Sequence, residues 1–296
     1  MWSFRYAAMD WAAHQSSWPH AAFSRFVQLP GQRWHVQVCG SGPVLLLLHG
    51  TGASSHSWRA LLAPLAAHYT VVCPDLSGHA FTTQHASQRP TLEHMAAQLQ
   101  ALLQQLQLWP HAVVGHSAGA AIGAQLLLQT QWPRPALIAL NPAWLPPQGV
   151  ASWLFPAAAR LLTMNALAAG LLARAGRQPG VVEALIQSTG SRLDAEGLGL
   201  YQRLLQSPGH VQAVLAMMRA WRLEALARAL PGLGGPVLVH LGGNDRTLGE
   251  EQAAQACALV PQAAVVRVPG LGHLAHEEAP AQTSAHILEW LSQTGR

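Results

Sequence analysis

The sequence predicts an α/β fold: a mostly parallel central sheet with helices on both faces and an inserted helical cap. Three observations support this fold class. Strands and helices alternate along most of the chain, which is typical of a parallel sheet with crossover helices. The alternation stops between about residues 144 and 232, where the chain is rich in Ala, Leu and Arg. An apolar strand at 112–114 also runs through a glycine–serine turn directly into a helix.

The elements follow in order along the chain. Strands are expected at 24–29 and 33–39, joined by Pro30-Gly31, a hairpin signal that adds an antiparallel edge. Val44–Leu48 is a continuous apolar run, as a buried central strand should be. Further strands are expected at 70–73, 112–114, 136–140, 236–241 and 263–268, and helices at 58–68, 91–108, 118–128, 250–259 and 280–292. Thr91 is placed to cap the second helix.

This pattern divides the chain into three parts. Residues 1–22 are expected to form a loosely structured lead-in, although Trp2, Trp11 and Trp18 offer apolar surface to the body. Residues 23–143 and 233–296 are expected to form the α/β core, and residues 144–232 the helical cap.

Composition narrows the class of protein. Of the 296 residues 50% are hydrophobic and only 10% are charged, which excludes intrinsic disorder. The low charge favours a large apolar core, with an apolar pocket or a lipid-facing surface as the alternative. The net charge of +4 equals the balance of residues 144–232, which hold eight Arg and four acidic residues. Such a segment suits an anionic small ligand or an anionic membrane face, whereas nucleic-acid motifs are absent.

The cysteines, the N-terminus and the longest apolar stretch bear on cellular location and metal binding. Cys39, Cys73 and Cys257 are widely spaced and odd in number, so we expect reduced thiols and neither a disulfide framework nor a zinc site. The N-terminus has no secretory pattern. The apolar stretch 153–173 contains a proline, an arginine and an asparagine, so no spanning helix is expected there. We therefore expect a cytoplasmic protein, with peripheral contact to the inner membrane as an alternative, and no cofactor.

The candidate nucleophile is Ser117, in Gly115-His116-Ser117-Ala118-Gly119. The motif alone is weakly specific, but here it follows an apolar strand and opens a helix, which is the required context. A serine on this sharp turn is exposed to substrate, and small residues two positions away avoid clashes.

A serine hydroxyl needs a base, and the base needs an orienting acid. Asp245 follows the strand expected at 236–241, and His273 follows the strand expected at 263–268 in a glycine-rich loop. Both therefore lie at the carboxyl ends of strands, where open α/β sheets bind ligands. Asn244 can serve the turn as well as Asp245 can. His276 competes with His273, but is better interpreted as a packing residue, and the string HLAHE matches no zinc motif.

An oxyanion hole is expected beside the nucleophile. The loop His49-Gly50-Thr51-Gly52 follows the first central strand, and one backbone N–H is expected from Thr51. The second is expected from Ala118, directly after the serine.

Together with HGTG and PDLSGH, these motifs resemble the α/β-hydrolase superfamily over about residues 24–293. One departure is Ala80, where many members carry glycine. A narrower resemblance lies in four strings: GHSAGAAIGAQLLLQ, LIALNPAWLPP, STGSRLDAEGLGLYQRLLQSPGHVQAVLAMMRAW and LGHLAHEE. These look like the magnesium-chelatase accessory proteins of bacteriochlorophyll biosynthesis in photosynthetic bacteria.

That resemblance implies a role near magnesium insertion into a porphyrin, with magnesium chelatase as a partner. Arg192, Arg203 or Arg219 could then pair with propionate carboxylates, and His210 could approach the ring or a bound Mg²⁺. The first hypothesis is a serine hydrolase acting on a tetrapyrrole ester. The alternatives are a porphyrin-binding accessory protein with an idle triad, and a carboxylester or carbon–carbon bond hydrolase unrelated to pigments.

Overall fold

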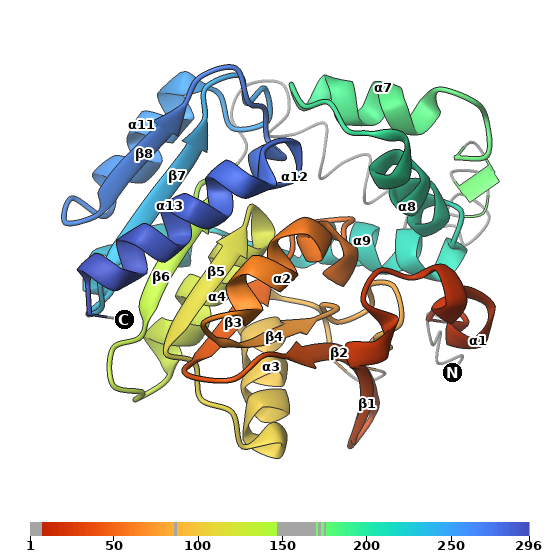
Figure 1. Ribbon diagram of the computed structural model, residues 1–296, viewed down its shortest axis with the longest axis horizontal. Helices are drawn as coiled ribbons and strands as arrows, with labels where there is room; N and C mark the ends of the chain where they lie inside the picture. Colours follow the sequence, from red (N-terminus) through yellow and green to blue (C-terminus); the bar gives the residue numbers. More distant parts are fainter. Residues whose placement is uncertain (1–7, 86–87, 147–169, 171–172, 175, 296) are drawn as a thin grey trace.

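The computed structural model describes residues 8–85, 88–146, 170, 173–174 and 176–295, which form one sheet flanked by helices (Figure 1). The sheet has eight strands in the order β1-β2-β4-β3-β5-β6-β7-β8. β1 pairs with β2 and β2 with β4 in antiparallel fashion, and all the other pairs are parallel. The strands are β1 (Ser24–Leu29), β2 (Gln32–Cys39), β3 (Val44–Leu48), β4 (Thr70–Pro74), β5 (Ala112–His116), β6 (Ala136–Leu140), β7 (Val237–Gly242) and β8 (Ala264–Val268).

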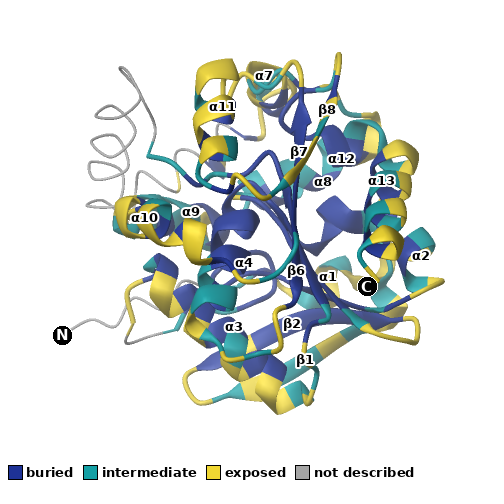
Figure 2. Ribbon diagram, turned by 90° about the vertical axis from the view of Figure 1, so that its left-hand side faces the viewer, coloured by how far each residue is buried: buried dark blue, intermediate teal, exposed yellow. Residues whose placement is uncertain are grey.

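Helices cover both faces of the sheet, as the alternation predicts, and Figure 2 shows the buried sheet edge-on between them. On one face, α3 (Leu92–Leu106), α4 (Ala118–Gln129), α10 (Glu224–Ala229) and α11 (Glu250–Ala258) contribute to a core that includes Leu46 and Leu48. On the other, α2 (Arg59–Ala66) and α13 (Pro280–Gln293) pack with Leu45 and Leu47. Alternate residues of β3 thus serve opposite cores, which explains its unbroken apolar run.

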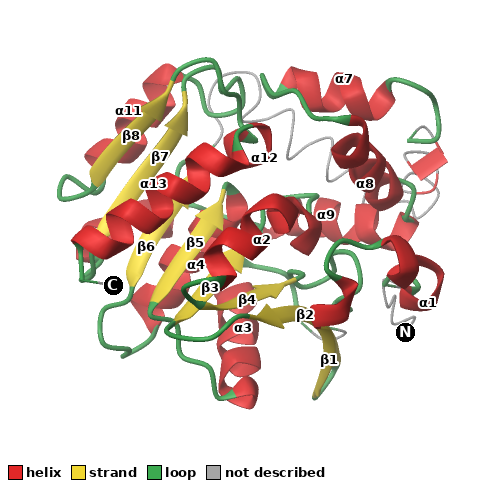
Figure 3. Cartoon of the chain, in the orientation of Figure 1, coloured by secondary structure: helices red, strands yellow, loops and turns green. Residues whose placement is uncertain are grey.

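Between β6 and β7 the described residues form helices and no strand (Figure 3). These helices are α7 (Val181–Ser188), α8 (Ala195–Leu205), α9 (Pro208–Ala220) and α10, followed by the 3₁₀ turn η4 (Leu230–Gly232). We call this part of the chain the insertion. The apolar stretch 153–173 lies almost wholly outside the described residues. Within the described part, no helix is both long and apolar enough to cross a membrane.

The lead-in is more ordered than expected. Its described residues form α1 (Trp11–His14) and the 3₁₀ turns η1 (Gln15–Ser17) and η2 (Ala21–Phe23). Trp18 is only 4% exposed and packs edge-on to Phe81 at 4.8 Å, and Trp11 packs on the same ring at 4.9 Å. Aromatic burial therefore fixes this segment to the body, while Trp2 lies outside the described residues.

Local details explain where elements begin. Thr91 caps α3 as predicted, because its hydroxyl accepts from the N–H of His94. The helix expected at 58–68 instead begins as the 3₁₀ turn η3 (Ser55–Trp58), with Ser54 capping it, and continues as α2. The hairpin signal is also confirmed: Gly31 adopts a φ of 77° between the paired residues Leu29 and Gln32.

Candidate active site

Ser117 lies where β5 turns sharply into α4. Its φ of 51° and ψ of −113° are rare for a residue with a side chain. A Cβ added at Gly115 would lie 2.5 Å from the Cα of Ala120, and one added at Gly119 would lie 2.0 Å from the carbonyl oxygen of Leu48. The turn therefore excludes larger residues at both glycines.

Asp245 and His273 lie after β7 and β8, and the structure brings them together. His273 Nδ1 is 2.7 Å from Asp245 Oδ2. Asp245 Oδ1 accepts from the backbone N–H groups of Thr247 at 2.7 Å and Leu248 at 3.1 Å. Burial alone would raise the pKa of Asp245, but these donors, His273 and Asn141 hold it below its usual value. Asp245 is therefore a carboxylate at neutral pH.

The tautomer of His273 follows from this contact. A carboxylate only accepts, so Nδ1 donates, and in the neutral ring Nε2 is left as an acceptor. That is the form a general base requires. Within the described residues, however, no hydrogen bond joins the hydroxyl of Ser117 to this ring. Asp245 and His273 are thus in contact, and among the described residues Ser117 shares no hydrogen bond with either of them.

Asn141 is a site residue that the sequence did not single out. It directly follows β6, has a φ of 44°, and its amide donates to Asp245 Oδ2 at 2.6 Å. Its Oδ1 accepts from the N–H of Gly242 at 3.1 Å. The available signal was a polar residue directly after a buried strand, at the edge of the sheet where ligands bind.

His116, the residue before the serine, was also missed as a site residue. Its Nε2 lies 2.9 Å from the carbonyl oxygen of His273, and the two ring centroids are 4.8 Å apart. Burial, followed by the charge of His273, lowers the pKa of His116 to about 3. His116 is therefore neutral, and its Nε2 donates to the backbone of His273 and helps to position it.

The loop after β3 lies against the serine turn. A Cβ added at Gly50 would lie 2.7 Å from His116 Nδ1 and 3.3 Å from the Cβ of Ser117. Within the described residues, the backbone N–H groups of Thr51 and Ala118 donate no hydrogen bond. Ala118 is the first residue of α4, and the amino end of a helix favours negative charge.

The insertion directly contacts the loops that carry Asp245 and His273. The carbonyl oxygen of Thr189 accepts from the N–H of Arg246 at 3.1 Å and from that of His273 at 3.3 Å. A Cβ added at Gly272 would lie 2.4 Å from the carbonyl carbon of Gly190. The turn after α7 therefore packs on the loops that carry Asp245 and His273.

A buried carboxylate links the insertion to the core nearby. Glu277 lies in α12 (Ala275–Glu278) and accepts from Ser57 Oγ at 2.6 Å, Tyr201 Oη at 2.7 Å and Arg59 Nη1 at 2.5 Å. Burial nevertheless raises the pKa of Glu277 above its usual value. His276, the alternative base, is 1% exposed and its Nε2 lies 2.9 Å from Ser57 Oγ, as suits a packing residue.

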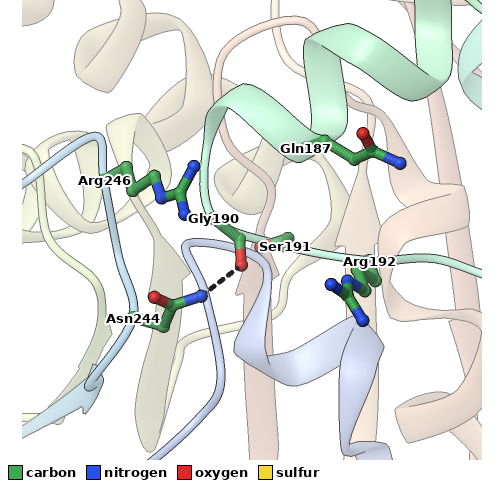
Figure 4. A pocket seen from close by; sticks show the side chains of 6 residues that line it. All are labelled: Gln187, Gly190, Ser191, Arg192, Asn244 and Arg246. Carbon is green, nitrogen blue, oxygen red and sulfur yellow. Dashed lines mark hydrogen bonds between the residues drawn. The ribbon is translucent and has the colours of Figure 1, made fainter.

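The three candidate ligand-binding arginines lie on different segments of the insertion. Arg192 and Arg246 flank Gly190 and Ser191 in a pocket of about 230 Å³ that does not include Ser117 (Figure 4). Arg203 is engaged elsewhere, because its Nη1 donates to the carbonyl oxygen of Ser17 at 3.2 Å and to its hydroxyl at 3.1 Å. Arg219 lies near the carboxyl end of α9.

His210 is not free to bind a ligand. Its Nδ1 accepts from the N–H of Ala80 at 3.1 Å, so its Nε2 donates to the carbonyl oxygen of Gly52 at 3.2 Å. Burial lowers its pKa to about 4. The hypothesis that His210 approaches a ring or Mg²⁺ is therefore wrong for this conformation. Ala80, where the resemblance expects glycine, has a φ of 42°. Among the described residues, no group of three or more His, Cys, Asp or Glu side chains could hold a metal ion.

The sheet order and the sharp serine turn at the end of β5 are typical of the α/β-hydrolase fold. Comparison with known protein families supports this assignment. The family model described as alpha/beta hydrolase fold matches residues 43–280. The chain therefore belongs to the α/β-hydrolase fold family. It is 40% identical over 285 residues to the magnesium-chelatase 30 kDa subunit of Rhodobacter capsulatus, covering 96% of this chain and 99% of that one. The predicted resemblance is thus confirmed.

Solved structures share the fold. An alpha/beta hydrolase fold protein from Burkholderia ambifaria superposes with a TM-score of 0.73 at 25% identity, covering 90% of this chain and 97% of that one. The epoxide hydrolase CorEH, solved without ligand, gives a TM-score of 0.75 at 21% identity, covering 91% and 98%. At this identity the second likeness concerns the fold alone.

Proposed function

We propose that this protein is a serine hydrolase of the esterase type with Ser117 as nucleophile, His273 as base and Asp245 as the orienting acid. The observation that carries the proposal is the 2.7 Å contact between Asp245 and His273, at the same edge of the sheet as the strained turn of Ser117. Backbone N–H groups of Thr51 and Ala118 would form the oxyanion hole.

The proposed reaction needs no other group. Ser117 Oγ attacks the ester carbonyl carbon while its proton passes to His273 Nε2, and Asp245 stabilises the imidazolium that forms. The alcohol leaves with that proton, and water then releases the acyl group by the reverse sequence. Hydrogen bonds of this kind are often long in free enzymes and tighten when substrate binds, which accommodates the present position of the Ser117 hydroxyl.

We further propose a tetrapyrrole as the substrate class, with magnesium chelatase as the partner. The support is the identity of 40%, over almost the whole of both chains, with a protein named as a magnesium-chelatase subunit. An ester on a porphyrin side chain would combine an apolar ring with a bond that a serine hydrolase cleaves.

Labelling with a fluorophosphonate probe tests the hydrolase proposal. Wild-type protein should form an adduct at Ser117 and hydrolyse an aryl ester, and Ser117→Ala should lose both. Ser292→Ala is the matched control, because that exposed hydroxyl donates to the carbonyl oxygen of Glu289 at 2.7 Å and has no other hydrogen bond among the described residues. A folded wild-type protein without an adduct at Ser117 and without esterase activity would rule the hydrolase out.

One observation favours a second candidate, a porphyrin-binding accessory protein with an idle triad. Within the described residues, Ser117 and His273 are not joined by a hydrogen bond. Under this alternative, Ser117→Ala binds protoporphyrin IX as tightly as wild type in a fluorescence titration and restores pigment synthesis in a deletion strain. Loss of restoration with binding retained would favour the hydrolase.

A further inference from the structure

A second hydroxyl–imidazole–carboxylate chain lies away from Ser117. Ser24 Oγ is 2.9 Å from His35 Nε2, and His35 Nδ1 is 2.8 Å from Asp75 Oδ2. Ser24 begins β1, His35 lies in β2, and Asp75 follows β4, so three neighbouring strands supply the three groups. We call Ser24, His35 and Asp75 the second relay.

The carboxylate of the second relay is held ionised. Asp75 is 0% exposed, and its Oδ1 accepts from the N–H of Ser55 at 2.8 Å while Oδ2 accepts from that of Phe81 at 3.3 Å. Burial would raise its pKa, but the contact with His35 and these donors hold it well below its usual value. His35 Nδ1 therefore donates to Asp75, and in the neutral ring Nε2 accepts the hydroxyl proton of Ser24.

Three aromatic rings surround the imidazole of His35. His35 is 0% exposed, and its ring lies 5.0 Å from Trp11, 5.3 Å from Phe26 and 5.2 Å from Phe81. These rings exclude water and fix the orientation of the imidazole, which strengthens its hydrogen bonds. Asp75 lies where it can stabilise a proton taken up by Nε2. The chemistry that activates a serine is therefore preassembled here.

The hydroxyl of Ser24 lies at the edge of this aromatic cluster and not inside it. Ser24 is half-buried, and Gln37 Nε2 lies 3.4 Å from its Oγ while donating to the carbonyl oxygen of Pro19 at 2.7 Å. The amide of Gln37 is the one side-chain donor that the described residues place beside the reacting oxygen.

We propose that Ser24 is a second nucleophile, which takes up an acyl or phosphonyl group from small activated donors such as aryl esters and fluorophosphonates. With a fluorophosphonate, a bond forms from Ser24 Oγ to phosphorus, the phosphorus–fluorine bond breaks, and the hydroxyl proton passes to His35 Nε2 before leaving with fluoride. With an aryl ester, Oγ bonds to the carbonyl carbon and the phenol leaves with the proton.

We expect this reaction to be slower than that of a full esterase, because Gln37 is the single side-chain donor that the described residues place beside Ser24 Oγ. Each oxyanion donor typically contributes about 10²–10³ in rate. Ser24 is therefore expected to be modified once and released slowly. This expectation is independent of Ser117 and of the proposed function.

The test is fluorophosphonate labelling of wild type and Ser117→Ala, followed by tryptic digestion and mass spectrometry. Cleavage after Arg5 and Arg25 releases Ser24 on a peptide separate from that of Ser117, and fragmentation distinguishes Ser24 from Ser16 and Ser17. We expect an adduct at Ser24 in both proteins. No adduct at Ser24 in folded wild-type protein overturns the proposal, whether or not Ser117 reacts, and this measurement needs no substitution.

Variants in the Ser117→Ala background test the relay itself. Adding Ser24→Ala should abolish the remaining label. Adding Ser188→Ala should leave it, because within the described part of the chain that hydroxyl bonds to the carbonyl oxygen of Leu185 alone, at 2.6 Å. Adding His35→Gln removes the base and should slow the labelling of Ser24 by at least about 10²-fold. An unchanged rate in the folded His35→Gln variant would show that the imidazole does not activate the serine.

Discussion

Asn141 donates a hydrogen bond of 2.6 Å to Asp245 Oδ2, the same oxygen that receives His273 Nδ1 at 2.7 Å. The two donors come from different strand ends, since Asn141 follows β6 and His273 follows β8. Their common acceptor is thereby fixed in position from two sides, and its negative charge is stabilised by both.

Asn141→Gly is expected to lower kcat for an aryl ester by about tenfold with little change in KM, because a hydrogen bond to a charged group is worth roughly 1.5–3 kcal/mol. Glycine tolerates the φ of 44°, so the backbone is retained. Steady-state kinetics across pH measure the effect. Gln293→Ala is the control, since that exposed amide in α13 donates to Glu289 Oε1 at 3.2 Å. A kcat equal to that of wild type would contradict a positioning role.

Gly50→Ala should lower kcat by about 10²-fold, the size of one lost oxyanion donor. The added Cβ would lie 2.7 Å from His116 Nδ1, so the loop that carries Thr51 must shift. Gly199→Ala is the control, because a Cβ at that position in α8 meets nothing within 4 Å. It should leave kcat unchanged and stabilise the protein by about 0.5–1 kcal/mol. Full activity in Gly50→Ala would exclude this loop from the oxyanion hole.

Tyr201→Phe should reduce the free energy of unfolding by about 1–3 kcal/mol, because Glu277 loses a buried donor at 2.7 Å. Urea denaturation of Tyr201→Phe, Glu277→Gln and the double variant completes a double-mutant cycle. A coupling energy near zero would mean that this contact does not fasten α8 to α12.

Acid should destabilise the fold below about pH 6.5, before the carboxylates titrate. Burial, the main cause in each case, lowers the pKa of His116 to about 3 and those of His49, His210 and His240 to about 4. Between those values and 6.5 the unfolded chain binds protons that the folded chain refuses, so stability is lost as pH falls. Each such proton contributes a slope of about 1.4 kcal/mol per pH unit.

Urea midpoints read by tryptophan fluorescence at pH 7.5, 6.5, 5.5 and 4.5 check this pH dependence. The pKa of Asp245 is lowered in the folded protein, so its protonation adds a loss of stability at still lower pH. The pKa of Glu277 is raised, so above its ordinary pKa of 4.5 the folded protein takes up this proton first, which opposes the loss of stability. His210→Gln should show a shallower slope by about one proton. Midpoints that stay constant from pH 7.5 to 5.5 would contradict the expectation.

The elements that the sequence located best are those with one dominant signal. β3 and β6 have the predicted bounds because an unbroken apolar run admits little other than a buried strand. The start of α2 was predicted to within one residue, but the 3₁₀ turn before it, which Ser54 caps, was not predicted. Order in the lead-in depends on Phe81, a contact that no local pattern contains.

Some contacts of the candidate site could likewise be predicted from the sequence, and others could not. Contact between Asp245 and His273 follows from topology, because the two residues lie in the loops after β7 and β8, which are neighbouring parallel strands. The roles of Asn141 and His116 depend on side-chain directions across the sheet, which spacing along the chain does not specify. His35 and Asp75 likewise meet only because β2 lies beside β4.

One acceptor, the carbonyl oxygen of Thr189, holds the backbones of Arg246 and His273 together. The loops that carry Asp245 and His273 therefore share one anchoring residue, which lies in the insertion and not on β7 or β8. Any displacement of the turn after α7 would pull on both loops in concert. The turn after α7 is thus mechanically coupled to the Asp245–His273 pair as a single unit.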